Sequence, residues 1–276
     1  MADFAIAAAA QPRAVTSAFQ GWASVSDEPT VRFVLPTEPL HAWTIVLVAA
    51  MAADRRRRGL QNTVLQAAAA SAGSEVARAA IEGLGATPAE ASHGRLQLLQ
   101  PIRDLRTARS IADKAVDAME KIAPTLSPSI ARMTRFVFEE MGANIVQHSG
   151  RSETGYGVAA IDPAGQRLEL AFADAGIGFR ASLQRNPELE DRIADDAEAL
   201  QLAVTPRITG TSTPRTNMGI GLKALTDFSD LLAGDLWIVS GSAMLRRSTT
   251  AGQRTNLFSS VPPWQGTWIA LDARIA

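Results

Sequence analysis

The clearest hydrophobic pattern of the chain lies in residues 128–149, where apolar side chains recur at three- and four-residue spacing. The repeated positions are Ile130, Met133, Val137, Met141 and Ile145. This period is typical of a helix that buries one face. Ser127 is a good N-cap, Pro128 fits the first helical position, and Gly150 supplies a C-terminal stop. The pattern therefore predicts a helix over 128–149.

Shorter patterns predict further elements along the chain. Strands are indicated by short apolar or alternating runs, and helices by longer segments with apolar residues on one or all sides. The strand-like runs lie at 31–36, 63–66 and 168–172, and the helical segments at 40–58, 74–84 and 104–122.

The alternation of strands and helices in the first hundred residues predicts a small βαβα unit with a partly parallel sheet. Turn-forming residues then gather between 86 and 103, so we place a domain boundary near residue 95. We expect a mobile, alanine-rich tail at 1–14, a small α/β domain at 15–95 and a second domain at 96–276.

The composition predicts a cytoplasmic protein with a sizeable core. The 276 residues are 46% hydrophobic and carry a net charge of −1, so we expect neither nucleic-acid nor membrane binding. The chain has no cysteine, which excludes disulfides and cysteine-based metal sites. The apolar run 42–53 is shorter than the roughly 20 residues that cross a bilayer. The arginines at 55–58 complement a helix C-terminus, and no second basic cluster accompanies them.

Three polar residues that can take part in binding or catalysis lie within the helix predicted at 128–149. Glu140, Asn144 and His148 are four residues apart and share one stripe of a helix. An amide oxygen can ligate Mg²⁺, and a carboxylate one turn away can orient or deprotonate an attacking hydroxyl. His148 either approaches a phosphate or faces water as a polar residue at the helix end.

Two glycine pairs follow this helix in the sequence. The strand at 168–172 leads to Asp174, Gly176 and Gly178, where tight turns admit a planar ring and the acid can accept a hydrogen bond from an exocyclic amine. The second pair consists of Gly219 and Gly221, which stand on either side of Ile220. It lies directly before Leu222 and Lys223. Exposed amides at the first turn of a helix suit a triphosphate.

The order of these three blocks resembles the nucleotide site of the GHKL ATPases, the superfamily of gyrase, the heat-shock chaperone ATPase, histidine kinases and the MutL proteins. The resemblance covers about two thirds of the chain, from about residue 100 onward. It implies a two-layer α/β sandwich, the Bergerat fold, with a mixed sheet over 96–276. It also implies ATP and Mg²⁺ as cofactors.

The resemblance assigns a role to each block. Glu140 is implied as the general base, Asn144 as the Mg²⁺ ligand and Asp174 as the reader of adenine. Backbone contacts to the nucleotide are implied for Gly176, Gly178, Gly219 and Gly221. Lys223 stays open between a phosphate contact and ordinary cover of the helix surface.

Two further stretches are similar to the anti-sigma-factor type within this superfamily. Residues 196–203 and 208–215 resemble its short helix and ATP lid, which brings Gly210, Thr211 and Arg215 into the expected site. Arg215 either neutralises phosphate charge or is a solvated loop arginine. The segment beginning at Gly266 and Thr267 resembles the closing strand, whose threonine touches the adenine-side acid and water. Met218 and Ile220 depart from the smaller or leucine-like residues common in the lid.

The first hundred residues faintly resemble a STAS domain, the module of anti-anti-sigma factors. This resemblance suggests a regulatory protein partner and leaves two readings for Thr44, as a phosphoacceptor or as a helix-facing threonine.

The leading expectation is a serine/threonine protein kinase of anti-sigma type. The alternatives are an ATP-hydrolysing conformational switch, a non-catalytic nucleotide-binding regulator and, less favoured, a histidine kinase. Only His41 and His93 precede the predicted ATP domain, and Gly94 argues against a helix around His93. The sequence leaves a homodimer open.

Overall fold

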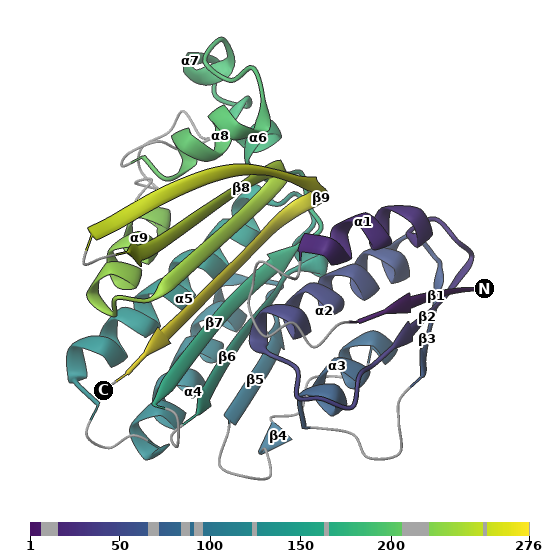
Figure 1. Cartoon of the computed structure of the whole chain (residues 1–276), viewed down its shortest axis with the longest axis horizontal. Helices are drawn as coiled ribbons and strands as arrows, with labels where there is room; N and C mark the ends of the chain where they lie inside the picture. The colour runs from purple at the N-terminus through teal and green to yellow at the C-terminus, as the bar shows by residue number, and fades with distance from the viewer. Residues whose placement is uncertain are drawn as a thin grey trace.

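The computed structural model of the chain describes residues 1–6, 16–65, 72–83, 89–90, 96–122, 126–162, 166–205, 221–250 and 253–275 (Figure 1). These residues form a mixed α/β protein with a small parallel sheet and a larger antiparallel sheet. None of the described helices combines the length and apolar character that crossing a bilayer requires.

The small sheet has three parallel strands in the order β1-β2-β3, each followed by a helix. Its strands are β1 (Ala2–Ala5), β2 (Thr30–Val34) and β3 (Gln61–Leu65). The helices are α1 (Thr16–Val25), α2 (Ala42–Arg57) and α3 (Ala72–Glu82). Figure 1 shows all three helices between the small sheet and the large one.

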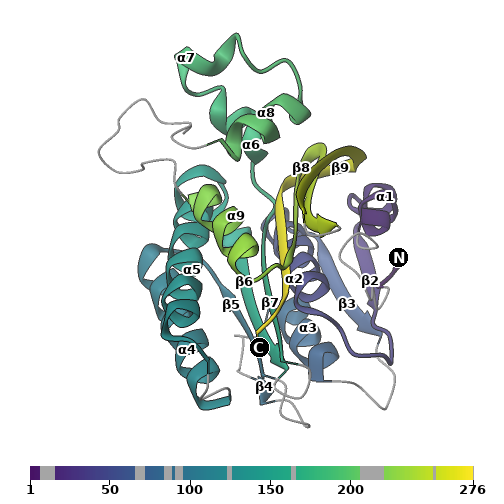
Figure 2. The ribbon, with the colours of Figure 1, turned by 60° about the vertical axis from the view of Figure 1, so that its left-hand side comes forward.

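The large sheet has the strand order β4-β5-β6-β7-β9-β8, and every described pairing in it is antiparallel. Its strands are β4 (Ala89–Glu90), β5 (Leu96–Pro101), β6 (Tyr156–Asp162), β7 (Arg167–Asp174), β8 (Asp235–Thr250) and β9 (Gln253–Arg274). One face is covered by α4 (Leu105–Ile122), α5 (Pro128–His148) and α9 (Gly221–Leu231), as Figure 2 shows. A 3-10 turn, η2 (Ser152–Thr154), links α5 to β6.

Three short helices stand beyond one end of the large sheet. They are α6 (Gly178–Leu183), α7 (Pro187–Glu190) and α8 (Asp196–Ala203). The first residue of α8 fastens this group to the sheet, because the Asp196 carboxylate accepts hydrogen bonds from both the backbone N–H and the hydroxyl of Ser242 in β8 (2.8 and 2.9 Å). A Cβ at Gly241 would collide with the same carboxylate, so this bulge of β8 requires glycine.

Side chains of the central strands alternate between two hydrophobic cores, as a pleated strand requires. In β6, Val158 and Ala160 belong to the core that contains α2, whereas Ala159 and Ile161 belong to the core under α4, α5 and α9. Both faces of the large sheet are therefore buried, and α2 covers the face that the later helices leave open.

Helix α2 is fixed at its N-terminus by a buried acid of the large sheet. One carboxylate oxygen of Glu169 accepts from the N–H of Ala42 at 3.0 Å, and the other lies 2.7 Å from His41 Nδ1. A carboxylate is favoured here because the first helical N–H groups carry partial positive charge. One residue further on, the carbonyl of Trp43 accepts from the indole N–H of Trp268 at 3.0 Å. The two sheets are thus joined by directed contacts as well as by packing.

The distal part of the β8/β9 hairpin is held to the end of α9 by a shared acid. Asp230 receives two hydrogen bonds from Arg247 (2.8 and 2.6 Å) and one from Arg254 (2.7 Å). The contact with Arg247, and then that with Arg254, lowers the pKa of Asp230 below its ordinary value despite partial burial. The carboxylate therefore stays ionised and keeps both arginines in place.

Most elements agree with the sequence expectations, and the mixed α/β class is confirmed. Three expectations are corrected. Residues 2–5 are a strand and not part of a mobile tail, because their backbone pairs with β2. The large sheet is antiparallel and not mixed. The second sheet begins at β4 (Ala89–Glu90), ahead of the expected boundary near 95, and α2 shares a core with it.

Helix α5 packs closely against α4 at a glycine. A Cβ at Gly142 would collide with the Cβ of Ala108, so the two helices approach as closely as their backbones allow. This contact sets the position of the helix that carries Glu140 and Asn144.

We expect Gly142→Val to lower the free energy of unfolding by roughly 1–3 kcal/mol, because the added methyl groups force the two helices apart. Urea unfolding followed by circular dichroism measures the change. Ala143→Val, at the next and partly exposed position, is the matched control and should lose less than about 1 kcal/mol. Equal losses in both variants would contradict the close contact.

Candidate functional site

A cavity opens at the end of the large sheet, between α5, α6, α9 and the strands β7 and β9. About 830 Å³ of space free of protein atoms lies within it and at its opening to solvent. It is lined by Met141, Asn144, Ile145, His148, Ser149, Phe172, Ala173, Asp174, Gly178, Phe179, Ser182, Leu183, Ala203, Gly221, Leu222, Thr267 and Ile269. Seven of these residues are among the site residues that the sequence predicts.

Helix α5 contributes one wall from successive turns. Ser127 caps it, with its side chain accepting from the N–H of Ser129, and Pro128 begins it, as the sequence predicts. Met141 and Ile145 are buried, which turns Asn144 and His148 toward the cavity. Four-residue spacing on a helix thus brings an amide and an imidazole to one wall.

Asp174 ends β7 at the base of the cavity. Its carboxyl is fully buried, and Oδ1 accepts from the N–H of Gly176 at 2.8 Å. Burial raises the pKa of Asp174 to about 7, and the backbone N–H groups of Gly176 and Thr267 only partly oppose that rise. In the register of the sheet Asp174 stands directly opposite Thr267 of β9, so these two polar residues face the cavity from neighbouring strands.

The turn after Asp174 depends on its glycines. A Cβ at Gly176 would collide with the carbonyl oxygen of Ser149. Gly176, a predicted site residue, is not among the residues that line the cavity. Gly178 has φ of +71°, a conformation that side chains rarely adopt, and a Cβ there would stand 2.8 Å from Ser240 Oγ. The next N–H, of Phe179, donates to the same oxygen at 2.8 Å. These contacts define the backbone path of the turn.

Helix α9 meets the polar stripe of α5 without an intervening side chain. A Cβ at Gly221 would be only 3.0 Å from Glu140 Oε2 and 3.2 Å from Asn144 Nδ2. Glu140 thus lies beside the start of α9, at the edge of the cavity and outside its lining. Leu222 lines the cavity. Lys223 instead pairs with Asp227 one turn along α9, so its ammonium group is engaged on the helix surface.

The titratable groups on α5 are both shifted by desolvation. Burial, and secondarily the charge of Glu139, raises the pKa of Glu140, which makes its carboxylate a better proton acceptor. Burial, and secondarily the charge of Arg185, lowers the pKa of His148, which favours the neutral imidazole. The site therefore offers a basic carboxylate, an amide and a buried acid within one region.

Five predicted site residues lie outside the described part of the chain. They are Gly210, Thr211, Arg215, Gly219 and Ile220. The sequence reasoning expected the short helix at 196–203, but it did not name Phe179, Ser182 and Ala203 of α6 and α8 as residues of the cavity wall. No local signal marks these positions, because their place in the cavity results from how short helices pack beyond the sheet.

No model of a known protein family matches the chain, and no curated protein matches it.

Asp174 should make stability depend on pH. Its pKa rises from 3.8 in the unfolded chain to about 7 in the folded protein, so the folded state holds the extra proton between these values. The corresponding stability is fully present below pH 3.8 and is lost as the pH rises to about 7. Between pH 5 and pH 8 the loss should be roughly 2–3 kcal/mol.

Asp174→Asn should remove this component, because an amide does not titrate. Urea unfolding of both proteins at pH 5, 6, 7 and 8 measures it, and contributions of other groups cancel in the difference. Two parallel stability profiles would show that Asp174 ionises in the folded protein at its ordinary pKa.

Proposed function

We propose that this chain binds Mg·ATP in the cavity between α5, α6, α9 and β9, as a nucleotide-binding protein of the GHKL type. The observation that carries the proposal is the buried carboxyl of Asp174 at the base of a largely apolar cavity whose upper wall holds Asn144 and the start of α9. An apolar cavity with few convergent polar groups is the usual form of a small-molecule site.

The part of the cavity around Asp174 and Thr267 suits a purine base. Asp174 accepts hydrogen bonds at its carboxyl, and Thr267 beside it offers a hydroxyl that both donates and accepts. Met141, Ile145 and Phe172 supply apolar surface on which a planar ring can lie. The 6-amino group of adenine is the complement of a buried acceptor, whereas guanine has a carbonyl oxygen at that ring position, and this favours adenine over guanine at Asp174.

The part of the cavity around Asn144 and the start of α9 suits phosphates and a magnesium ion. Gly221 leaves the backbone of α9 open toward Asn144, whose amide oxygen is a suitable Mg²⁺ ligand. Within the described residues, no group of three or more His, Asp or Glu side chains is placed to hold a metal ion. The ion would accordingly take most ligands from phosphates and water, as Mg²⁺ commonly does, and would neutralise charge on the transferred phosphate.

We further propose that the chain is a regulatory serine/threonine protein kinase of anti-sigma type. A hydroxyl oxygen of a partner attacks the γ-phosphorus, the bond to the β–γ bridging oxygen breaks, and ADP leaves. Glu140 takes the hydroxyl proton, a role that its raised pKa supports. Thr44 is a poor acceptor, because it is only 5% exposed in α2. We therefore propose that the acceptor hydroxyl belongs to a partner protein.

Asp174→Ala should abolish ATP binding, since the adenine amine loses its acceptor and the cavity loses its selectivity. Titration calorimetry with Mg·ATP and Mg·GTP measures the effect, and the wild type should prefer ATP. Asp272→Asn changes a carboxyl of β9 outside the cavity lining and is the matched control, expected to keep its affinity. Wild-type affinity in Asp174→Ala would refute the assignment of the base site.

The fate of the γ-phosphate tests the proposed activity. With γ-labelled ATP and Mg²⁺, label on serine or threonine of a co-purified or added partner supports the kinase, and Glu140→Gln should bind ATP while losing transfer. Free phosphate without labelled protein would favour an ATP-driven switch. Binding with neither product would favour a non-catalytic regulator, and label on histidine would favour a histidine kinase.

A further inference from the structure

Residues 149–154, the segment after α5, form hydrogen bonds with the turn that follows Asp174. The hydroxyl of Thr154 accepts from the N–H of Ala175 at 3.0 Å, and Arg151 Nη1 donates to the carbonyl of Ala175 at 3.1 Å. The N–H of Ile177 donates to the carbonyl of Ser149 at 2.9 Å. Both backbone groups of the residue next to Asp174 are therefore bonded to this one segment.

Arg151 reaches the opposite strand as well. With its amide oxygen turned toward the guanidinium group, Gln265 accepts from Arg151 Nη1 at 2.6 Å and from Nη2 at 3.1 Å. Gln265 lies two residues before Thr267. One guanidinium group thus connects the end of β7 with the middle of β9, where Asp174 pairs with Thr267.

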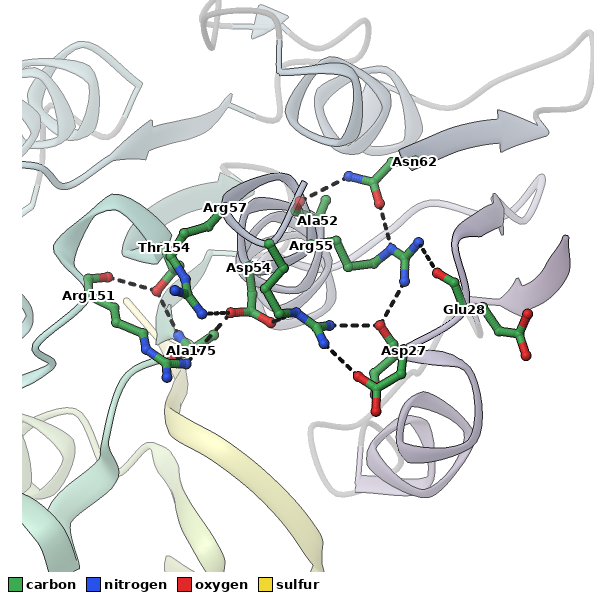
Figure 3. Close-up of polar contacts among 12 residues, drawn as sticks. Asp27, Glu28, Ala52, Asp54, Arg55, Arg57, Asn62, Arg151, Thr154 and Ala175 are labelled. Atoms are coloured by element: carbon green, nitrogen blue, oxygen red, sulfur yellow. Dashed lines mark hydrogen bonds and ion pairs between the residues drawn. The ribbon is translucent and has the colours of Figure 1, made fainter. Parts of the chain in front are cut away.

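The same guanidinium group faces the small unit of the protein. Arg151 Nη1 lies 3.7 Å from Asp54 Oδ1, at the C-terminal end of α2 (Figure 3). The side chain of Asp54 is only 10% exposed, so its charge acts with little screening by water. Asp54 also pairs with Arg57 at 3.2 Å and Arg58 at 3.0 Å, which hold its carboxylate in place.

The end of α2 is in turn anchored to the small sheet. Arg55 is fully buried and donates to the carbonyls of Ser26, Glu28 and Gln61 and to Asn62 Oδ1, at 2.7–2.9 Å. Asn62 also donates to the carbonyl of Ala52 at 2.9 Å. A movement of the small sheet must therefore move the end of α2 and Asp54 with it (Figure 3).

We propose that Arg151 is a positioning residue through which Asp54 and α2 set the geometry of the base-binding turn, so that the small α/β unit controls nucleotide affinity. The inference rests on the proposed function, because it takes the nucleotide to be the ligand of the cavity. By linkage, a protein partner that shifts the C-terminal end of α2 weakens nucleotide binding, and bound nucleotide resists that shift by the same factor.

The first measurement is the affinity for Mg·ATP by calorimetry in Asp54→Asn, Arg151→Gln and the double variant. Each single change should weaken binding about tenfold. The double variant should be no weaker than the weaker single variant, because both changes interrupt one connection. Arg78→Gln is the matched control: Arg78, on α3 of the same small unit, also pairs with carboxylates, but these are Glu75 and Glu82 and not Asp54. Its affinity should stay within about twofold of the wild type.

The second measurement is hydrogen exchange of a peptide covering residues 174–178 without nucleotide. The exchange should be faster in Asp54→Asn and Arg151→Gln than in the wild type, and unchanged in Arg78→Gln. If Arg151→Gln does not fold, Arg151→Lys takes its place, since it keeps the charge but loses the forked donors.

The outcomes separate the two proposals. Failure of the wild type to bind ATP refutes the proposed function, while exchange in the turn still decides the coupling. Binding by the wild type with unchanged affinity and exchange in Asp54→Asn overturns the coupling alone. Strictly additive losses in the double variant, or equal losses in Arg78→Gln, also overturn it, because they indicate general destabilisation.

Discussion

The burial of α2 between two sheets is the constraint on which the rest of the structure depends. Every residue from Ala42 to Arg55 is buried, and a helix that is apolar on all sides has to be covered on all sides. The small sheet covers one side and the large sheet covers the other, so neither unit completes its core alone. The large sheet is consequently buried on both faces, and its central strands are apolar at consecutive positions.

The packing of α2 between the two sheets helps to determine the geometry of the cavity. Glu169 in the middle of β7 caps α2, and the same strand ends at Asp174, so the strand that locates the helix also places the buried acid. Pairing of β7 with β9 then brings Thr267 to Asp174. The opposite wall comes from α5, whose close contact with α4 at Gly142 sets how far the polar stripe stands from the sheet. The packing of the core therefore sets the position of each wall of the site.

The sequence predicts those features that depend on local patterns. The stripe of Glu140, Asn144 and His148 follows from helical period, and the turn after Asp174 follows from its glycines. Strand pairing is different, because the antiparallel order of the large sheet is set by contacts between distant segments. The apolar character of α2 shows that it must be buried, but not which sheet covers it. The pairing of Lys223 with Asp227, in contrast, is a local i,i+4 pattern on α9, and it keeps Lys223 out of the cavity lining.

The burial of Asp174 is unfavourable for folding and meaningful for binding. Within the described residues, backbone N–H groups of Gly176 and Thr267 favour its ionised form, and burial outweighs them. A buried acceptor of this kind gains most from a ligand that donates a hydrogen bond, because the donor replaces solvation that folding removed. Ligand binding and ionisation of Asp174 therefore favour one another. A ligand without a donor at that position does not compensate for the solvation that the carboxylate loses on burial. Selectivity for an exocyclic amine follows from the same burial that lowers the stability of the ligand-free protein.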